Sequence, residues 1–216
     1  MKKELQKRIL SSLVLIPVAF FFIIKGSFFF NFFLLICLII TLYEWHMMSK
    51  KKSYNIFGHL FLLLSFICTY LIYNSGAAGF VNNSGDGLYI FLGILLVCIS
   101  TDFGGYIFGK ILKGPKLTKI SPNKTYAGVF GGYFLSIIFL ISYVNFNKQN
   151  YELENFLLVI LISTISQIGD ITVSYFKRLS KVKNTGKLIP GHGGILDRID
   201  GMIFTFPFYF IFDLIY

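Results

Sequence analysis

The chain has 216 residues, of which 55% are hydrophobic and 19% aromatic, whereas only 14% are charged. This profile lies outside the usual range of soluble domains, so it excludes an ordinary water-soluble enzyme or binding module. The formal net charge of +10 is gathered in blocks between apolar runs. Such placement indicates contact with the anionic headgroups of membrane lipids and gives no support to a nucleic-acid partner.

Seven apolar runs follow one another along the chain, at residues 9–25, 28–43, 57–73, 88–109, 128–146, 155–177 and 201–216. Each is close to the length of about 20 residues that crosses a bilayer as a helix. In lipid, a helix satisfies all of its own backbone hydrogen bonds, so these runs are expected to be helical. We therefore predict an all-α polytopic integral membrane protein with about seven transmembrane helices.

The basic residues predict how these helices are oriented. Lys and Arg gather at the N-terminus and in the loops after the second, fourth and sixth runs, whereas the intervening loops hold only Lys25 and Lys148. Loops rich in Lys and Arg lie on the cytoplasmic side of a membrane. We therefore expect a cytoplasmic N-terminus and three cytoplasmic loops.

Acidic residues are scarce, with ten in the whole chain. Six lie in tails, loops or near the ends of apolar runs, where contact with water explains them: Glu4, Glu44, Asp86, Glu152, Glu154 and Asp213. Of the other four, Asp102 and Asp170 fall inside apolar runs, roughly 10 to 12 Å from the cytoplasmic end at the rise of a helix. A carboxylate at that depth costs on the order of 3 kcal/mol, so it indicates a function.

The pattern around these acids suggests chemistry on phosphates. Asp170, Ser174, Lys177 and Arg178 share one helical face by their spacing, and Asp197 and Asp200 share another if the last helix begins near Gly194. Carboxylates without a His or Cys cluster suit Mg²⁺ held together with substrate phosphates. Phosphoryl or nucleotidyl transfer is the reaction class that such a set favours. An ion-coupled transporter also buries carboxylates, but it leaves the glycine-rich stretch 187–201 without a role.

The stretch GGYIFGKI, residues 104–111, nearly matches a phosphate-binding loop. It departs from that motif because Ile111 stands in place of the hydroxyl residue and no strand precedes it. Gly104, Gly105 and Gly109 are instead expected to permit close packing of two helices.

Residues 174–200 closely resemble the signature of the phosphatidate cytidylyltransferase, or CDP-diacylglycerol synthase, family. The matching positions are Ser174, Lys177, Arg178, Lys183, Gly186, Pro190, His192, Gly193, Gly194, Asp197, Arg198 and Asp200. Three further segments, 100–110, 121–128 and 169–174, are similar to segments of the family in the same order. The chain departs from the family at usually charged or aromatic positions, which here hold Asn123, Tyr126, Ala127, Val173 and Asn184.

The resemblance implies that CTP and phosphatidic acid are the substrates and that CDP-diacylglycerol and pyrophosphate are the products, for phospholipid biosynthesis. It implies Mg²⁺ at Asp170 and Asp197, and it leaves open a second cation and a homodimer. The implied catalytic residues are Asp170, Asp197, Asp200, Lys177 and Arg178. The implied substrate-binding residues are Asp102, Ser121, Lys124, Thr125, Ser174, His192, Gly193, Gly194 and Arg198.

On this interpretation, residues 1–90 are N-terminal transmembrane helices, and residues 91–216 form a catalytic transmembrane region with two cytoplasmic loops. The implied location is the bacterial inner membrane, with the active site facing the cytoplasm. A CTP-dependent kinase of isoprenoid alcohols and the ion-coupled transporter are the alternatives.

Overall fold

The computed structural model describes residues 2–75, 87–118, 120–121, 124–146, 153–191 and 193–215. All regular structure in this part of the chain is helical. The helices are α1 (Lys2–Ile24), α2 (Ser27–Ser49), α3 (Asn55–Ser75), α4 (Gly87–Leu112), α5 (Tyr126–Phe146), α6 (Leu153–Leu179), α7 (Leu196–Ile199) and α8 (Met202–Ile215).

Each of the seven apolar runs coincides with one helix, namely α1 to α6 and α8. Five helices, α2 to α6, are long and apolar enough to cross a membrane. The apolar segments of α1 and α8, Leu10–Ile24 and Met202–Ile215, are shorter. For the described residues, the all-α class with several helices long and apolar enough to span a membrane is therefore confirmed, whereas the count of seven spans stays a prediction.

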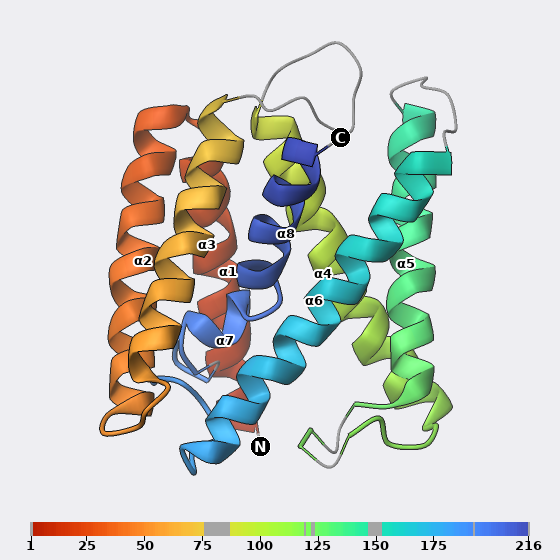
Figure 1. Ribbon diagram of the computed structural model, residues 1–216. Coiled ribbons are helices and arrows are strands. Elements are labelled where there is room, and N and C mark those ends of the chain that lie inside the picture. Colours follow the sequence, from red (N-terminus) through yellow and green to blue (C-terminus); the bar gives the residue numbers. More distant parts are fainter. Residues whose placement is uncertain are drawn as a thin grey trace.

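The helices run up and down in one bundle, so that their ends form two opposite faces (Figure 1). The start of α1 lies at the same end of the bundle as the C-terminal ends of α2, α4 and α6. The basic loops follow these three helices, so the positive charge is gathered at one end of the molecule, as the sequence pattern requires. The cytoplasmic orientation of that end stays a prediction.

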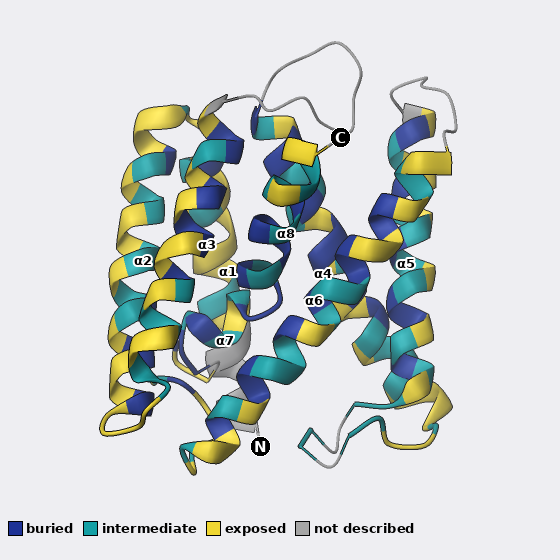
Figure 2. Cartoon of the chain, in the orientation of Figure 1, coloured by how far each residue is buried: buried dark blue, intermediate teal, exposed yellow. Residues whose placement is uncertain are grey.

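Buried apolar side chains form two clusters. The larger one fills the middle of the bundle and includes Ile72, Ile94 and Ile162. The smaller one lies between α2, α3, α6 and α8 and includes Trp45 and Leu196. Many residues on the helices are exposed (Figure 2). They include large apolar side chains such as Phe28, Phe57 and Phe130, as expected where helices face lipid. The smaller cluster fixes α7 against α2 and α6.

Helices α4 and α5 pack closely through glycine. A side chain at Gly104 would collide with the backbone carbonyl of Gly131, so the two helices approach at a distance that only glycine permits here. Helix α4 continues without a break through residues 104–111. The expectation of close packing at Gly104 is confirmed, and this stretch forms no phosphate-binding loop.

Candidate active site

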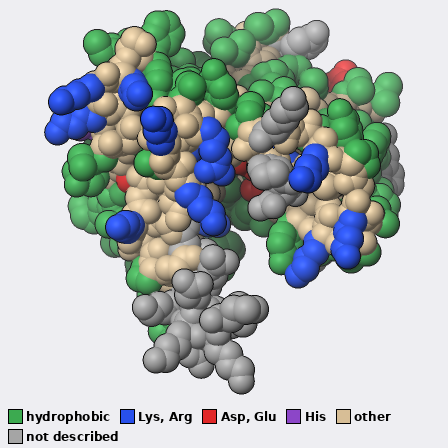
Figure 3. Space-filling model, turned by 90° about the horizontal axis from the view of Figure 1, so that it is seen from below, with side chains coloured by type: hydrophobic (Ala, Val, Ile, Leu, Met, Phe, Trp, Pro, Cys, Tyr) green, Lys and Arg blue, Asp and Glu red, His purple; other side chains and the backbone are tan. Residues whose placement is uncertain are grey.

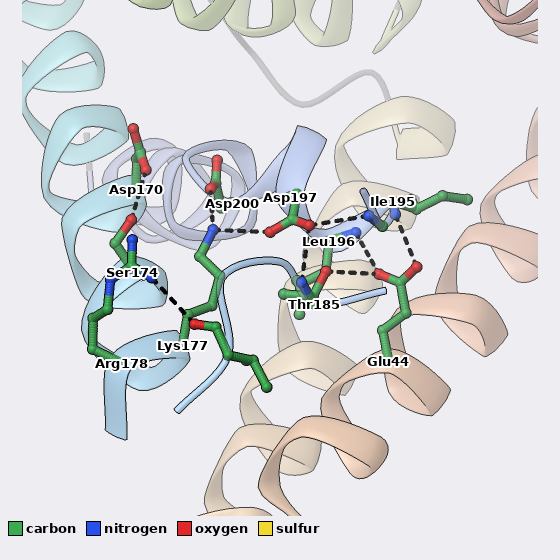
Figure 4. A network of polar contacts seen from close by, with 12 residues as sticks. Glu44, Asp170, Ser174, Lys177, Arg178, Thr185, Ile195, Leu196, Asp197 and Asp200 are labelled. Atoms are coloured by element: carbon green, nitrogen blue, oxygen red, sulfur yellow. Dashed lines mark hydrogen bonds and ion pairs between the residues drawn. The ribbon is translucent and has the colours of Figure 1, made fainter. Parts of the chain in front are cut away.

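The candidate site lies at the basic end of the bundle, where three segments meet. Two of these are the C-terminal half of α6 and the segment 180–201 that leads into α8 (Figure 4). The third is the connection between α4 and α5, which contributes Lys124. Lysine and arginine side chains are spread over this face of the molecule, and acidic side chains are visible in a recess near its middle (Figure 3). Carboxylates from separate segments come close to one another at this end of the bundle.

Asp170 projects from α6 and is held by two side chains. Lys124, which precedes α5, forms an ion pair with Asp170 Oδ2 at 2.5 Å. Ser174, one turn further along α6, donates a hydrogen bond to Asp170 Oδ1 over 3.3 Å. The expected pairing of Asp170 with Ser174 on one helical face is confirmed, and Lys124 joins the site from a different segment.

Lys177 lies between the two other acids of the site. Its ammonium is 2.9 Å from Asp197 Oδ1 and 3.6 Å from Asp200 Oδ2. All three side chains are largely buried, so the charges interact with little screening by water. A single lysine of α6 therefore bridges the two acids that the sequence places three residues apart.

Asp197 organises the glycine-rich loop around itself. Its Oδ2 accepts hydrogen bonds from the backbone amides of Thr185, over 2.9 Å, and Gly194, over 3.0 Å. Gly193 has a φ of +91°, and a side chain there would come within 2.6 Å of Asp197 Oδ2. Burial raises the pKa of Asp197, but the bonds from Gly194, Lys177 and Thr185 outweigh it and hold the pKa below its usual value. Asp197 is thus a stable carboxylate.

Asp200 has the opposite electrostatic surroundings. Burial, followed by the negative charges of Asp170 and Asp102, raises its pKa from 3.8 to about 8, although Lys177 opposes the shift. Asp102 itself is an exposed side chain of α4. Because Asp170 and Asp102 both act on Asp200, the structure brings the four acids of the expected set into one electrostatic cluster.

The last helix begins later than expected. A short helix, α7, holds Asp197, and α8 begins only at Met202 after a turn at Asp200 and Gly201. The turn is tight because Gly201 packs against the backbone and hydroxyl of Ser166 on α6. Asp197 and Asp200 nevertheless point toward the same lysine.

Other expected site residues make local contacts. Arg178 is exposed and donates a hydrogen bond to the carbonyl of Val182 over 3.2 Å. Thr125 caps α5 by accepting a bond from the Gly128 amide, and the Ser121 amide donates to Thr118.

The last two expected substrate-binding residues are Arg198 and His192. The side chain of Arg198 is exposed on α7. The expectation for His192 lies outside the described residues.

Glu44 is a buried acid that the sequence interpretation assigned to solvent, and that assignment is wrong. The side chain is 3% exposed, because α2 continues to Ser49 and carries Glu44 inside the bundle. It accepts hydrogen bonds from Thr185 Oγ1, Ile195 N and Leu196 N. The signal that would have found it is an acid set between apolar and aromatic residues of a helix, the same signal that identified Asp102.

One departure from the family signature has a visible structural consequence. Val173, at a usually acidic position, is 2% exposed and packs with Trp45 and Leu62 in the smaller apolar cluster. This position is therefore part of the core that supports the site, and it contributes no charge to it.

The donor atoms of the cluster suit a hard divalent cation. Asp170 contacts Lys124, and Asp197 and Asp200 contact Lys177. The negative charge of Asp102 also acts on Asp200, so four carboxylates belong to the cluster. Oxygen ligands of this kind are the ones that Mg²⁺ prefers. The arrangement can therefore hold a metal ion and present ammonium groups to phosphates beside it.

Comparison with known proteins gives consistent results. A sequence model described as the cytidylyltransferase family matches residues 6–79 and 59–216. A phosphatidate cytidylyltransferase of Rickettsia bellii is 34% identical over 229 aligned positions, which cover 100% of this chain and 93% of the relative. One of Staphylococcus haemolyticus is 37% identical over 177 positions, which cover 80% of this chain and 65% of the relative.

The match to a phosphatidate cytidylyltransferase of Staphylococcus aureus is 40% identical over 132 positions, which cover 59% of this chain and 50% of the relative. The chain therefore spans between half and two thirds of the length of these staphylococcal relatives. It spans nearly the whole length of the rickettsial one.

Proposed function

Since the chain belongs to the cytidylyltransferase family, we propose that it transfers the cytidylyl group of CTP to phosphatidic acid. The products are CDP-diacylglycerol and pyrophosphate. The observation that most supports this activity is the cluster of four carboxylates and two lysines at one end of an apolar helical bundle. Such a cluster is suited to a substrate with several phosphates and to a second substrate that resides in the membrane.

We propose that Mg²⁺ binds to Asp170 and Asp197, with Asp200 as a further ligand or as a group that orients the site. Bound there, the metal offsets the negative charge of the CTP phosphates and of the leaving pyrophosphate. The low pKa of Asp197 favours this role, because the carboxylate is already ionised at neutral pH. A second cation remains compatible with the surplus of acids around Asp102 and Asp200.

The lysines of the site have donors to spare for phosphate. An ammonium group carries three N–H donors; Lys177 donates one of them to Asp197, and Asp200 lies 3.6 Å away as an ion-pair partner. Lys124 reaches Asp170 in the same way. The remaining donors are available to CTP. Arg178 and Arg198 are exposed at the same end of the bundle and would bind the β- and γ-phosphates.

In the reaction, a phosphate oxygen of phosphatidic acid forms a bond to the α-phosphorus of CTP. The bond from that phosphorus to the oxygen shared with the β-phosphate breaks, and pyrophosphate leaves. The attacking oxygen is already anionic at neutral pH, so no strong general base is required. The residues of the site act by positioning the two phosphates and by offsetting their charge.

The lipid substrate would reach the acids from the side of the bundle. Asp102 is exposed on α4, and the exposed aromatic side chains of Phe103 and Tyr106 follow it. This combination offers apolar surface for acyl chains beside the charged end of the site. We propose that the protein resides in the bacterial inner membrane with the site facing the cytoplasm, where CTP is available. A homodimer is compatible with this arrangement.

The test uses the purified protein in lipid vesicles with CTP labelled at the α-phosphorus. We expect label in the lipid fraction only when phosphatidic acid and Mg²⁺ are both present. A kinase would instead transfer label from the γ-position to an isoprenoid alcohol, so a parallel sample with γ-labelled CTP separates the two activities. Labelled lipid only from γ-labelled CTP, or no labelled lipid at all, would overturn the proposal.

A further inference from the structure

Glu44 lies near the end of α2, yet its carboxylate reaches the loop that carries Asp197 (Figure 4). It accepts hydrogen bonds from Thr185 Oγ1 over 3.1 Å, from Ile195 N over 3.0 Å and from Leu196 N over 2.9 Å. Nothing in the acid cluster contacts it directly. Glu44 is thus connected to the site through the backbone of the loop.

The loop supplies the donors that make the burial of Glu44 tolerable. A buried carboxylate is costly unless cations or several hydrogen bonds compensate it. Among the described residues, no Lys, Arg or His lies within ion-pair distance of Glu44. Its compensation comes from the hydroxyl of Thr185 and the backbone amides of Ile195 and Leu196, which must therefore keep their present arrangement around it.

The same few loop groups are divided between Glu44 and Asp197. Thr185 donates its hydroxyl to Glu44 and its backbone amide to Asp197. Of three successive amides, that of Gly194 binds Asp197, whereas those of Ile195 and Leu196 bind Glu44. A side chain at Gly194 would collide with Glu44 and Thr185, so only glycine at this position allows the segment to donate hydrogen bonds to both Glu44 and Asp197. The position of Asp197 is therefore coupled to Glu44.

Two further hydrogen bonds connect the segment 180–191 to the N-terminal part of the chain. Ser11 of α1 donates a hydrogen bond to the carbonyl of Pro190 over 3.1 Å. Tyr54, between α2 and α3, lies 2.8 Å from the hydroxyl of Ser180, where the loop begins. Helices α1 and α2 thus form one wall of the loop and do not serve only as membrane anchors.

We propose that Glu44 is a positioning residue that holds Thr185 and residues 193–197 in the conformation that presents Asp197 to the metal and to CTP. This role rests on the proposed cytidylyltransferase activity. Without Glu44, the loop samples other conformations, and only a fraction of molecules is ready to bind. The apparent dissociation constant of Mg²⁺ and CTP rises as that fraction falls, whereas saturating ligand restores the competent loop.

The proposal predicts a characteristic kinetic change in Glu44→Gln. The glutamine keeps one acceptor oxygen but turns an NH₂ group toward donors of the loop. We expect the KM for CTP and the Mg²⁺ requirement to rise roughly tenfold, while kcat at saturation stays within about threefold of the wild type. A purely structural role would instead lower the amount of active protein and leave KM unchanged. Glu154→Gln, which removes an exposed acid from the first turn of α6, is the matched control.

Hydrogen exchange in the protein without metal or nucleotide provides a readout that does not depend on activity. We expect the amides of peptides covering residues 185–197 to exchange about tenfold faster or more in Glu44→Gln, with no change in Glu154→Gln. Thr185→Val removes one of the three bonds and should give a smaller increase in the same peptides. If Glu44→Gln does not fold, hydrogen exchange and KM are measured on Thr185→Val instead.

The outcomes separate the two proposals. Unchanged exchange and unchanged KM in Glu44→Gln, or in Thr185→Val where only that variant folds, would overturn the role of Glu44, whatever reaction the protein catalyses. Failure of the wild-type protein to label lipid from CTP would overturn the proposed function, and the exchange result would then still report on the loop.

Discussion

The two acids proposed to bind the metal are held in place by different means. Asp170 projects from the long helix α6, its side chain is 28% exposed, and its partners are the side chains of Lys124 and Ser174. Asp197 lies in the four-residue helix α7, its side chain is 6% exposed, and two backbone amides of the preceding segment hold one of its oxygens. The long helix α6 places Asp170, whereas Asp197, in the short helix α7, is placed by hydrogen bonds from neighbouring segments of the chain.

This difference separates the tasks of the two halves of the site. The helix keeps Asp170 in position even when its partners move away, so Lys124 is free to turn from the acid toward a phosphate. Helix α7 has only four residues and is too short to fix Asp197 by itself, so the position of Asp197 depends on Glu44 of α2 and Lys177 of α6. The exact position of Asp197 is therefore the more vulnerable of the two.

The largest effect is expected when each acid is converted to its amide. Asp197→Asn and Asp170→Asn should each lower Mg²⁺-dependent product formation by about 100-fold or more, because each removes a proposed metal ligand. Only Asp197→Asn should also loosen the loop, because bonds from backbone amides to a charged acceptor contribute about 1.5 to 3 kcal/mol each. Product formation and hydrogen exchange of residues 185–197 measure the two effects.

Near-wild-type product formation by Asp197→Asn would show that the metal assignment is wrong. Equal loosening of the loop in both variants would contradict the difference between helix and loop, even if both variants lose activity. Glu154→Gln serves again as the control, since its carboxylate lies in the first turn of α6 and is exposed.

The sequence predicted the arrangement of Asp170 on α6 better than the contacts that hold Asp197. Periodicity placed Asp170 and Ser174 on one face of a helix, and the structure joins them by a hydrogen bond. Glu44 could not be assigned in this way, because its partners lie about 140 to 150 residues further along the chain and no local pattern encodes such contacts. The apolar run ended at residue 43, so the acid was placed at the edge of a helix that in fact continues to Ser49.

The same limit applies to Lys177, Arg178 and Lys124. Spacing placed Lys177 and Arg178 on one helical face, but only tertiary structure shows that the first is buried between two acids and the second faces solvent. Lys124 was expected in the site from the resemblance, but its partner, Asp170, became known only from the structure. The fold class required composition alone, because apolar runs of this length have few alternatives to helices in lipid.

Asp197 and Asp200, three residues apart, should respond to pH in opposite directions. Asp200 has a pKa raised from 3.8 to about 8, so the folded protein retains a proton that the unfolded chain releases across that window. In the metal-free protein, the free energy of unfolding should therefore fall as pH rises from about 5 to 8, by at most about 1.4 kcal/mol per pH unit. Asp197 has a lowered pKa, so its contribution is present near neutral pH and is lost only in acid.

Unfolding by denaturant, measured in the presence of a chelator at several pH values, tests this contrast. Asp200→Asn should remove the decline toward pH 8, whereas wild-type protein with Mg²⁺ should lose it because the metal favours the ionised carboxylate. A metal-free wild-type protein whose stability rises between pH 5 and 8 would show that Asp200 is not the protonated group.

The smallest effect is expected at Arg178, which follows Lys177 on α6 but is exposed and hydrogen-bonded to the carbonyl of Val182. Arg178→Ala should raise the KM for CTP by about two- to fivefold and leave kcat unchanged, because an exposed cation gains little from a phosphate in water. The difference should disappear as salt is raised toward about 0.5 M, where screening acts over a few ångströms. Lys181→Ala, at another exposed basic residue just beyond α6, should change KM less. A loss of kcat in Arg178→Ala comparable to that in Asp170→Asn would mean that Arg178 turns into the site during catalysis and works there beside Lys177.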